Sequence, residues 1–519
     1  MAYIIGMDLG NHFSFPSYIA NTDLSVSRLG GNPVDLLPSN NEVANGYPSV
    51  FFYSQTVAET CRKKSTTPPP WYGLDAVRGQ ARPASKRVRN FKRHMNEQLH
   101  VDDLDTNYDD LITGMIQYLM RHANEQLMTE TLQTTNLLSL AYPATFTASQ
   151  MLHLKNLAEK ATLEDGMRVK VVGMIAEPAA AALDYLVEHG CADKEITVLV
   201  YDLGGGTFDL SIVTAYPQGR KAENSDNIRY FDINATGGLK NLGGTEFDNV
   251  MIKLLNAKAA DDGAAIHKDT VERLAEVAKR ELSEQTEAEV DFIDINTGAA
   301  ITLEVTRDEF EEKTASLMKQ TIEETQRFLD GYQGPKPEMI ILTGGSSNMP
   351  MVKRELEKAF PQFAGSVQKF RPSRAISYGA ARYSQNEEAV QQHVTHDIGI
   401  QFYRGKSEDL FVDTFIPAGT ELPFKSRWNL SHLRADGPLI SQFPIMEAKI
   451  NNPNPDRVDQ DYTLITTLEM EHGPDKKADD PTESRMILDN NGLLHVEARD
   501  PSKPGMPPVK CEFHLKNLS

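Results

Sequence analysis

Cysteine is scarce in this sequence, which holds only Cys61, Cys191 and Cys511 among its 519 residues. The three lie far apart and form no C-x-x-C pair, so the sequence offers neither a disulfide framework nor a structural zinc site. This usage indicates a reducing compartment. The G-x-x-x-x-G-K-[ST] motif is also missing, which excludes the P-loop class of nucleotide-binding proteins.

Long apolar runs are missing as well. No stretch approaches about 18 uninterrupted apolar residues, so we expect no membrane span. No basic segment precedes the first apolar run, so we expect no signal peptide and a cytoplasmic location. The net charge is −20, from 53 basic and 73 acidic side chains. This excess of acid opposes non-specific nucleic-acid binding, and we expect neither nucleic-acid nor membrane partners.

The sequence does contain a glycine-rich turn between two apolar stretches, at Val198–Val213, VLVYDLGGGTFDLSIV. The three consecutive glycines can direct their backbone N–H groups toward one anion. Asp202 and Asp209 flank the turn, and two carboxylates beside a phosphate suit a phosphate that carries Mg²⁺. The pattern predicts a hairpin that holds a metal–nucleotide, although an ordinary glycine-rich hairpin shares it.

The start of the chain repeats this design. Tyr3–Phe15, YIIGMDLGNHFSF, has an apolar strand, an Asp-Leu-Gly turn and a second strand, and Asp8 aligns with Asp202. A unit used twice predicts two similar lobes, each offering one hairpin to a shared cleft. One aspartate from each lobe would then flank the same metal-bound phosphate chain.

Two further charged residues are candidates for this cleft. Gln80–Asn96 is rich in lysine and arginine, which generally indicates a solvated face, but Lys92 within Phe91-Lys92-Arg93 could point into an acidic cleft. Glu177 precedes Pro178 at the start of a helix predicted over Ala179–Tyr185. A carboxylate at this junction could orient a water molecule, and N-capping of the helix explains it equally well.

Three later segments have the residue types of a nucleotide site. Leu242–Asp248 is a second glycine turn that leads into an amphipathic helix. Val271–Ser283 places Glu276, Lys279, Arg280 and Ser283 on one helical face, which is either a solvated face or a contact for ribose and adenine. Met339–Val352 is a buried strand, a Gly344-Gly345-Ser346 turn and a helix from about Pro350, a typical phosphate or nucleoside contact.

The composition and the periodicity of the sequence change at Ser384. The polar segment Ser384–Val394 is typical of a linker. Short strand patterns follow, among them Asp397–Phe402 and Tyr462–Glu471, with a hairpin signal at Asn490-Asn491-Gly492. We therefore predict a small β domain without long helices.

Five motifs occur in one order along the chain: DLG after the first strand, DLGGGTFD, EPAAAALDY, AKRELS and LTGGSSNMP. In order and spacing they resemble the seventy-kilodalton heat-shock chaperones of the DnaK type. VTHDIGIQF, IPAGTELP and ILDNNGLLHVEARD resemble, more weakly, that family's peptide-binding β-sandwich. The resemblance implies an α/β fold: an actin-like two-lobed ATPase domain at 1–385, a linker at 386–394 and a β-sandwich at 395–519.

The resemblance also implies roles for the matching residues. Asp8 and Asp202 would hold a hydrated Mg²⁺. The implied catalytic residues are Lys92, Glu177, Thr207 and Asp209. The residues implied to bind ATP or ADP are Gly10, Asn11, His12, Gly204, Gly205, Gly206, Thr207, Gly243, Gly244, Glu276, Lys279, Arg280, Ser283, Gly344, Gly345 and Ser346. Hydrolysis would be phosphoryl transfer to water, catalysed mainly by positioning and charge stabilisation.

Several positions depart from the family's pattern. Two threonines after the first DLG are replaced by Asn11 and His12; a protonated His12 could pair with phosphate, whereas a neutral one would crowd the site. Asn348 replaces the arginine that stacks on adenine, and Ser373 replaces a nearby aspartate, so we expect lower nucleotide affinity. Met151 replaces an arginine that relays between the domains.

These departures lead to a hypothesis about coupling. The acidic–hydrophobic interdomain linker is replaced by polar Glu387–Val394, and we expect no helical lid because the sequence ends at its last predicted strand. With linker, lid and relay arginine all altered, we expect nucleotide to control peptide affinity only weakly. A difference of about tenfold or more between ATP and ADP would refute this hypothesis.

Three functions remain open on the sequence. The first is a slow ATP-hydrolysing chaperone-like protein that binds unfolded or extended polypeptide, with co-chaperones as possible partners. The second is a non-hydrolysing nucleotide-binding protein whose β domain recruits a partner, which His12 favours. The third is a small-molecule kinase of the same superfamily, which the absence of an acceptor-binding insertion and the C-terminal β domain disfavour.

Overall fold

The computed structural model of the chain describes residues 2–21, 33–36, 46–52, 71–78, 87–101, 104–146, 148–189, 194–221, 228–385, 390–391, 394, 396–404, 409–418, 420, 424–432, 440–448, 453–471, 481–488, 494–503 and 505–512. The chain divides into two compact units. The first comprises Met1–Thr145, Leu157–Phe231 and Thr236–Val390, and the second comprises Phe146–Asn156, Asp232–Ala235 and Gln391–Ser519.

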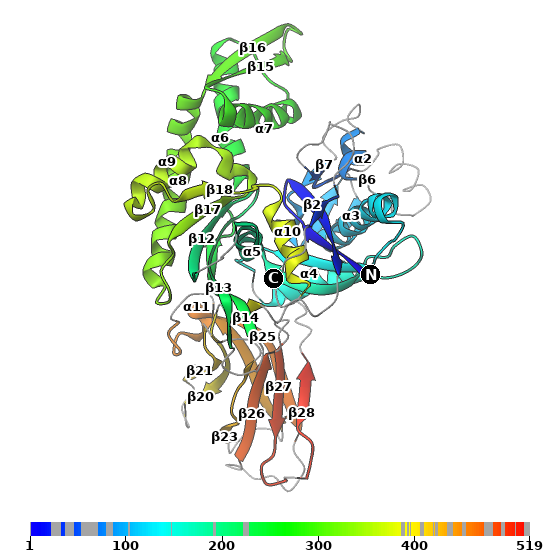
Figure 1. The fold of residues 1–519 in the computed structure, drawn as a ribbon, viewed down its shortest axis with the longest axis vertical. Coiled ribbons are helices and arrows are strands. Elements are labelled where there is room, and N and C mark those ends of the chain that lie inside the picture. Colours follow the sequence, from blue (N-terminus) through cyan, green and yellow to red (C-terminus); the bar gives the residue numbers. More distant parts are fainter. Residues whose placement is uncertain are drawn as a thin grey trace. The chain divides into compact units, whose positions relative to one another are not determined.

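The first unit is built on two sheets (Figure 1). Their strand orders are the same when the strands of each sheet are counted along the chain from its own first strand, β1 or β12. The N-terminal sheet runs β11-β10-β1-β2-β3, and β4 also pairs with β2. Its strands are β1 (Ala2–Asp8), β2 (Phe13–Asn21), β3 (Val34–Asp35), β4 (Tyr47–Pro48), β10 (Leu137–Tyr142) and β11 (Lys170–Ala176). Strand β1 is antiparallel to β2 and parallel to β10, so the hairpin of the first DLG turn is the centre of this sheet.

The second sheet repeats this order as β18-β17-β12-β13-β14, with the two-residue β19 beyond β14. Its strands are β12 (Ile196–Leu203), β13 (Phe208–Lys221), β14 (Ile228–Leu239), β17 (Met339–Thr343), β18 (Val367–Lys369) and β19 (Val390–Gln391). Strand β12 is antiparallel to β13 and parallel to β17. Asp8 is the last residue of β1, and Asp202 is the next-to-last residue of β12. Asp202 pairs in register with Asp209.

Helices and small sheets complete the first unit and the segment that follows β10. The helices are α2 (Gly73–Arg78), η4 (Phe91–His94), α3 (Tyr108–Thr131), α4 (Ala148–Lys160), α5 (Glu177–His189), α6 (Gly244–Asp261), α7 (Lys268–Glu284), α8 (Arg307–Gly331), η5 (Gly345–Asn348), α9 (Pro350–Ala359), η6 (Pro361–Phe363) and α10 (Ala375–Tyr383). The small sheets are β5 (Val50–Phe52), β6 (Trp71–Tyr72) and β7 (Arg87–Arg89), then β8 (Gln98–Val101) with β9 (Leu104–Asn107), and β15 (Glu287–Ile293) with β16 (Ala300–Thr306).

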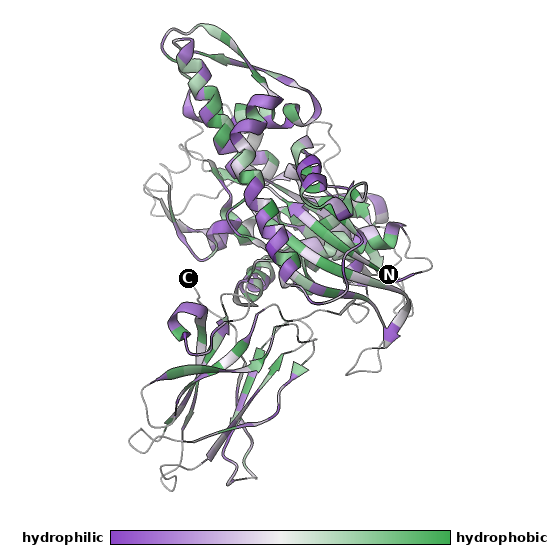
Figure 2. Cartoon of the chain, turned by 90° about the vertical axis from the view of Figure 1, so that its left-hand side faces the viewer, coloured by the Kyte–Doolittle hydropathy of each residue, from purple (hydrophilic) through white to green (hydrophobic). Residues whose placement is uncertain are grey.

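Local chemistry accounts for the helix starts. Helix α8 begins with a capping box, in which the Thr306 hydroxyl accepts from the Glu309 N–H and the Glu309 carboxylate accepts from the Thr306 N–H. Helix α9 begins at Pro350, where a missing N–H costs nothing. Figure 2 shows that the central strands of the first unit are mainly hydrophobic, and buried Leu199, Tyr201 and Ile340 belong to the core beneath the second sheet.

The second unit contains two antiparallel sheets that share one hydrophobic core. Their orders are β21-β20-β24-β25 and β22-β26-β27-β28, with β23 paired to β26. The elements are β20 (Ile398–Tyr403), β21 (Leu410–Ile416), β22 (Phe424–Lys425), β23 (Asn429–His432), β24 (Ile440–Ala448), α11 (Val458–Asp461), β25 (Tyr462–Glu471), β26 (Pro481–Leu488), β27 (Leu494–Arg499) and β28 (Val509–Glu512). Ile400 and Phe443 from one sheet and Met486 and Val496 from the other are all buried in this core.

Most predicted elements agree with the structure within a few residues. One boundary is wrong: the helix predicted from Ala179 begins at Glu177, so this carboxylate belongs to the first helical turn. Most of the predicted linker and the Asn490-Asn491-Gly492 turn lie outside the described residues. None of the described helices has both the length and the hydropathy needed to cross a membrane.

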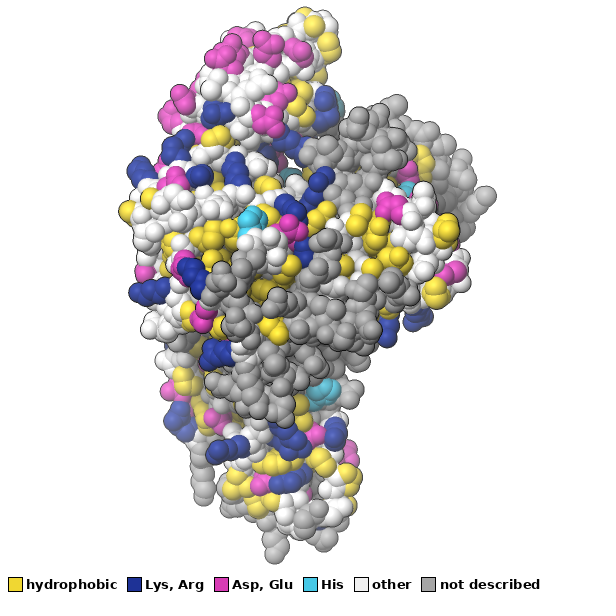
Figure 3. Space-filling view, in the orientation of Figure 1, with side chains coloured by type: hydrophobic (Ala, Val, Ile, Leu, Met, Phe, Trp, Pro, Cys, Tyr) yellow, Lys and Arg dark blue, Asp and Glu magenta, His cyan; other side chains and the backbone are white. Residues whose placement is uncertain are grey.

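Acidic side chains gather over the β15–β16 hairpin (Figure 3). The alternating burial of β15 exposes Glu287, Glu289 and Asp291 on one face, and Glu304 of β16 lies directly opposite Glu289. This end of the first unit is therefore acidic, which makes it unsuited to binding a polyanion.

Candidate active site

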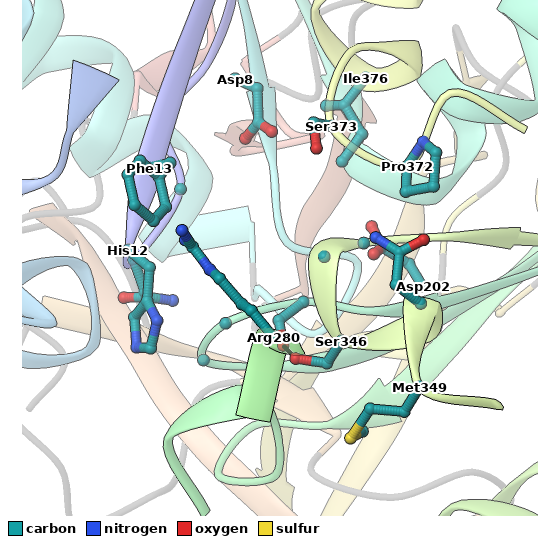
Figure 4. Close-up of a pocket in the computed structure, with 18 of the residues that line it drawn as sticks. Asp8, His12, Phe13, Asp202, Arg280, Ser346, Met349, Pro372, Ser373 and Ile376 are labelled. Atoms are coloured by element: carbon teal, nitrogen blue, oxygen red, sulfur yellow. Dashed lines mark hydrogen bonds between the residues drawn. The ribbon is translucent and has the colours of Figure 1, made fainter. Parts of the chain in front are cut away.

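Both DLG hairpins face one cavity of about 590 Å³ in the first unit (Figure 4). Its wall includes Asp8 of β1 and Asp202 of β12, the two aspartates that the sequence pattern pairs. Of the predicted site residues, those that line the cavity are Asp8, Gly10, Asn11, His12, Lys92, Glu177, Asp202, Gly204, Gly205, Gly206, Thr207, Glu276, Lys279, Arg280, Ser283, Gly344, Gly345 and Ser346. Asp209, Gly243 and Gly244 are not among the lining residues.

A buried ion pair lies beside the two aspartates. Lys92, on η4, donates to the Glu177 carboxylate at the start of α5, and both side chains are more than 90% buried. Lys92 Nζ also donates to the Leu9 carbonyl oxygen at 2.8 Å, which anchors the ammonium to the first DLG turn. The lysine predicted from Phe91-Lys92-Arg93 therefore points into the acidic cleft rather than into solvent.

The aspartates have abnormal acidities because they are buried together. Burial, reinforced by the negative charge of Glu177, raises the pKa of Asp8 to about 8, although Lys92 opposes the shift. Burial and the neighbouring charges of Glu177, Asp209 and Asp8 raise the pKa of Asp202 well above its usual range. Burial raises the pKa of Asp209 to about 7. Such a cluster of carboxyls favours a compensating cation.

The glycine turn after β12 is held from behind by the start of α6. The Gly244 N–H donates to the Gly204 carbonyl and the Thr245 N–H to the Gly205 carbonyl, each at 2.8 Å. Ser346 Oγ donates to the Gly204 carbonyl at 3.0 Å. The Gly204 and Gly205 carbonyls are thus engaged, and the Gly204 N–H donates to the Thr207 carbonyl at 3.1 Å, so the conformation of the turn is fixed. Gly244 supports the turn without lining the cavity.

Asn11 and His12 pack directly against this glycine turn. A Cβ built on Gly206 would lie 2.1 Å from Asn11 Nδ2, and one built on Gly205 would lie 2.9 Å from His12 Cγ. Only glycine fits at these positions while both side chains keep their places. His12 Nε2 also lies 3.0 Å from Thr245 Oγ1, so the first turn is tied to α6.

The ring of His12 is neutral. Burial, followed in size by the positive charge of Lys279, lowers the pKa of His12 to about 3, and Glu276 opposes the shift only in part. The neutral form is therefore the form present near pH 7. This is the form that we expected to crowd the phosphate site.

Arg93 joins three parts of the site. Its guanidinium forms a bidentate pair with Glu246, with N–O distances of 3.0 and 3.1 Å, and also donates to the Gly206 carbonyl. Glu246 accepts in turn from the Gly243 N–H at 2.7 Å. The segment that carries Lys92 is thereby fixed to the glycine turn and to the start of α6. Arg93 is not among the site residues predicted from the sequence, although its place beside Lys92 was the available signal.

The polar residues of α7 differ in what they contact. Lys279 pairs with Asp248 at 2.7 Å and also donates to the Gly244 carbonyl, so its charge is already compensated. Arg280 reaches toward Phe13, and its guanidinium lies 4.7 Å from the centre of that ring (Figure 4). Arg280 is therefore the member of this row best placed to contact a planar ligand.

The Hsp70 protein family matches residues 84–506, which is most of the chain. The chain belongs to the Hsp70 family. The resemblance recognised from its motifs is thereby confirmed, and the mixed α/β content with several sheets fits the Hsp70 ATPase fold. Members of this family are generally ATP-binding chaperones.

Asp209, predicted as a catalytic residue, is not among the residues that line the cavity. It is buried, and one of its carboxylate oxygens accepts from the Thr145 N–H at 3.2 Å. It also accepts a hydrogen bond from the Thr207 side chain. In this Hsp70 protein Asp209 therefore contacts both Thr207 of the glycine turn and Thr145, which follows β10.

The cavity also contains residues that the motif comparison passed over. Apolar Phe13, Phe15, Met349 and Ile376 line it, together with Lys369. These residues carry no local signal, because an isolated phenylalanine or methionine in a strand or loop is generally part of a core. Asn348 and Ser373, where the family has arginine and aspartate, both line the cavity, so these substitutions do alter its wall.

The residues present fit a Mg²⁺–nucleotide. No group of three or more His, Cys, Asp or Glu that could hold a metal occurs among the described residues. Mg²⁺ bound with a nucleotide takes most of its ligands from water and phosphate and needs only one or two carboxylates. Asp202 Oδ1 is buried without a hydrogen-bond partner in the described part of the chain, as expected for an oxygen that awaits a cation.

Proposed function

We propose that the first unit is an actin-like two-lobed ATPase domain that binds ATP with Mg²⁺ between its two sheets and hydrolyses it slowly. The observation that carries this proposal is the convergence of Asp8, Asp202, Lys92 and Glu177 in one cavity from four separate elements. Two carboxyls with raised pKa values and a buried lysine suit a phosphate chain that carries a cation. Arg280 and Phe13 offer a planar surface for the base at another part of the wall.

Each residue has a proposed task in hydrolysis. Lys92, fixed by the Leu9 carbonyl and Glu177, stabilises negative charge that develops on the transferred phosphoryl group. Glu177 accepts a hydrogen bond from the attacking water, and Thr207, held in place by Asp209, turns its single hydroxyl proton from Asp209 to a phosphate oxygen when nucleotide binds. Mg²⁺, when bound at Asp8 and Asp202, would neutralise charge on the phosphates.

The second unit is proposed to be a β-sandwich that binds extended polypeptide. Its two antiparallel sheets share one core, so each sheet turns its other face away from that core, and this face could contact a partner. An extended peptide could be held through backbone hydrogen bonds and side-chain pockets. The proposed overall function is that of a chaperone-like protein with a slow ATPase.

A second candidate is a nucleotide-binding protein that does not hydrolyse. The neutral His12, packed on Gly205, favours it because an imidazole supplies less stabilisation to a phosphate than the hydroxyl it replaces. In that case nucleotide would be a structural ligand, and the second unit would recruit a partner.

One experiment separates the two candidates. ATP turnover and ATP binding are measured on the same preparation, by phosphate release and by calorimetry. Binding together with turnover that depends on Lys92 and Thr207 supports the ATPase. Purified protein that keeps bound ATP intact for hours supports the non-hydrolysing protein, and failure to bind ATP contradicts both.

A further inference from the structure

The hydrogen bonds around His12 determine which ring nitrogen carries the proton. Thr245 Oγ1 lies 3.0 Å from His12 Nε2 and 2.9 Å from the Gly205 carbonyl oxygen. A carbonyl can only accept, so the single hydroxyl proton goes to Gly205, and His12 Nε2 must donate to the hydroxyl oxygen. Because the ring is neutral, His12 Nδ1 then carries a lone pair.

This Nδ1 is an acceptor at the wall of the cavity. His12 lines the cavity, and its Nδ1 makes no hydrogen bond to any described residue. The ring packs on Gly205, a member of the turn proposed to hold phosphate. A phosphate oxygen is also an acceptor, so a phosphate beside the unprotonated Nδ1 would find two lone pairs facing each other.

Burial, together with the charges around His12, explains why the ring is neutral before a ligand enters. Lys279 and Arg280 of α7 and Arg89 of β7 contribute positive charge, and Glu276 of α7 contributes negative charge. Glu276 pairs with both arginines, Arg89 at 2.9 Å and Arg280 at 3.1 Å. On α6, Glu246 beside Thr245 is likewise compensated by Arg93.

A phosphate chain would reverse this balance, because several negative charges would then lie beside the ring. Nearby negative charge favours the protonated imidazole, and a protonated Nδ1 becomes a donor toward phosphate.

We propose that His12 takes up a proton when a phosphate-bearing nucleotide binds, so that Nδ1 changes from an acceptor into a donor to phosphate. This inference rests on the proposed nucleotide-binding function and deepens it. It assigns His12 the role of the threonine hydroxyl that it replaces, which is to donate a hydrogen bond to phosphate. His12 can do this only when its ring is protonated. Affinity for nucleoside di- and triphosphates therefore increases as the pH falls, whereas affinity for an unphosphorylated nucleoside does not.

The test is calorimetric titration of Mg–ATP at pH 7 in buffers with different ionisation enthalpies, which gives the number of protons taken up. The proteins are the unmodified chain, His12→Asn and His12→Gln, with His267→Asn as control because His267 is exposed and does not line the cavity. Protonation of ATP itself is common to all four and cancels. We expect the unmodified chain and the control to take up about one more proton per ATP than the two His12 variants.

A second arm repeats the titrations with ATP and with adenosine from pH 8 to pH 5.5. We expect ATP affinity, relative to His12→Asn, to rise about 100-fold as the pH falls, because uptake of about one proton changes affinity about tenfold per pH unit, while adenosine affinity shows no such change. Equal proton numbers in the unmodified chain and a folded His12 variant overturn the inference and leave the nucleotide site intact. If the unmodified chain binds no ATP, the proposed function fails and the inference fails with it.

Discussion

The two sheets of the first unit have the same strand order but different turns at their centres. In the second sheet the turn after Asp202 is glycine, glycine, glycine and threonine, whereas after Asp8 it is glycine, asparagine and histidine. Across each hairpin, Asp202 faces Asp209 and Asp8 faces Phe15. One half therefore presents bare backbone and two carboxyls, and the other presents side chains and one carboxyl.

This difference teaches that a repeated fold need not repeat its chemistry. Both halves have an aspartate at the end of the central strand, as the proposed sharing of one cation requires. The remaining positions have diverged, and the side chains of the first turn fill the space above the glycines of the second. The glycine turn is thus the proposed phosphate-binding half, and the side chains of the first turn lie against it.

The largest effect is expected where the equivalent helices of the two halves, α5 and α10, meet. Asp184 of α5 accepts from Arg382 Nε at 2.9 Å, and both side chains are completely or almost completely buried. Asp184→Ala leaves a buried guanidinium short of a partner, so the free energy of unfolding should fall by ~3 kcal/mol in urea titrations. The double variant Asp184→Leu/Arg382→Leu should lose much less.

The control for that comparison is an exposed pair. Glu323→Ala removes the partner of Lys319 on the surface of α8, where both side chains are more than half exposed, and should cost less than about 1 kcal/mol. Equal losses for Asp184→Ala and Glu323→Ala would show that the two helices do not depend on the buried pair.

The next largest effect concerns the lysine that the first half contributes. Lys92→Ala should lower steady-state ATP turnover by about 100-fold, because the variant lacks the positive charge proposed to stabilise the transferred phosphoryl group. Circular dichroism and thermal unfolding should show a folded protein, and Lys319→Ala, which changes an exposed lysine, should turn over normally. Turnover by Lys92→Ala at the unmodified rate would mean that the two halves do not form the assigned site.

A smaller effect with a defined pH dependence is expected at Asp8. Its pKa is about 8 in the folded protein and 3.8 in its ordinary state. The unfolded chain therefore releases this proton at lower pH than the folded chain, and in the absence of Mg²⁺ and nucleotide this carboxyl lowers stability as the pH rises from about 4 to about 8.

Asp8→Asn removes that loss. We expect the variant to be more stable than the unmodified protein by at least ~2 kcal/mol at pH 7.5 and about equally stable at pH 4. Asp261→Asn, which changes an exposed carboxyl at the end of α6, should show no such difference. A stability gain that is the same at both pH values would contradict the raised pKa.

The smallest effect tests the packing of one turn on the other. Gly206→Ala places a Cβ 2.1 Å from Asn11 Nδ2, so Asn11 must move and ATP affinity should fall by about tenfold in calorimetry. Asn11→Gly in the same chain should restore part of the affinity. Gly331→Ala, with open space around its Cβ, is the control and should bind normally.

The sequence predicts those parts of the fold and site that depend on neighbours in the chain. The hairpins of Asp8 and Asp202 could be predicted because a strand, a turn and a strand are contiguous. The start of α9 at Pro350 followed from local chemistry. The β15–β16 hairpin and α8 were not predicted, although alternating residues and the Thr306–Glu309 capping box were visible signals.

Contacts between distant segments could not be predicted in the same way. Asp184 and Arg382 lie 198 residues apart, and His12 and Thr245 lie 233 apart. Neither residue of either pair is unusual within its own segment, so only the packing of the elements brings them together. The substitution at His12 was visible in the sequence, but its neutral state depends on burial and on Lys279.

The most direct test of the account is whether Asp8 and Asp202 serve one Mg²⁺–nucleotide. Calorimetry of Mg–ATP binding to the unmodified protein, Asp8→Asn, Asp202→Asn and the double variant decides it. If both carboxyls hold one cation, each single variant should lose at least about tenfold in affinity, and the double variant should lose little more than either single one. Losses that simply add, or a single variant that binds as the unmodified protein does, would contradict the shared site.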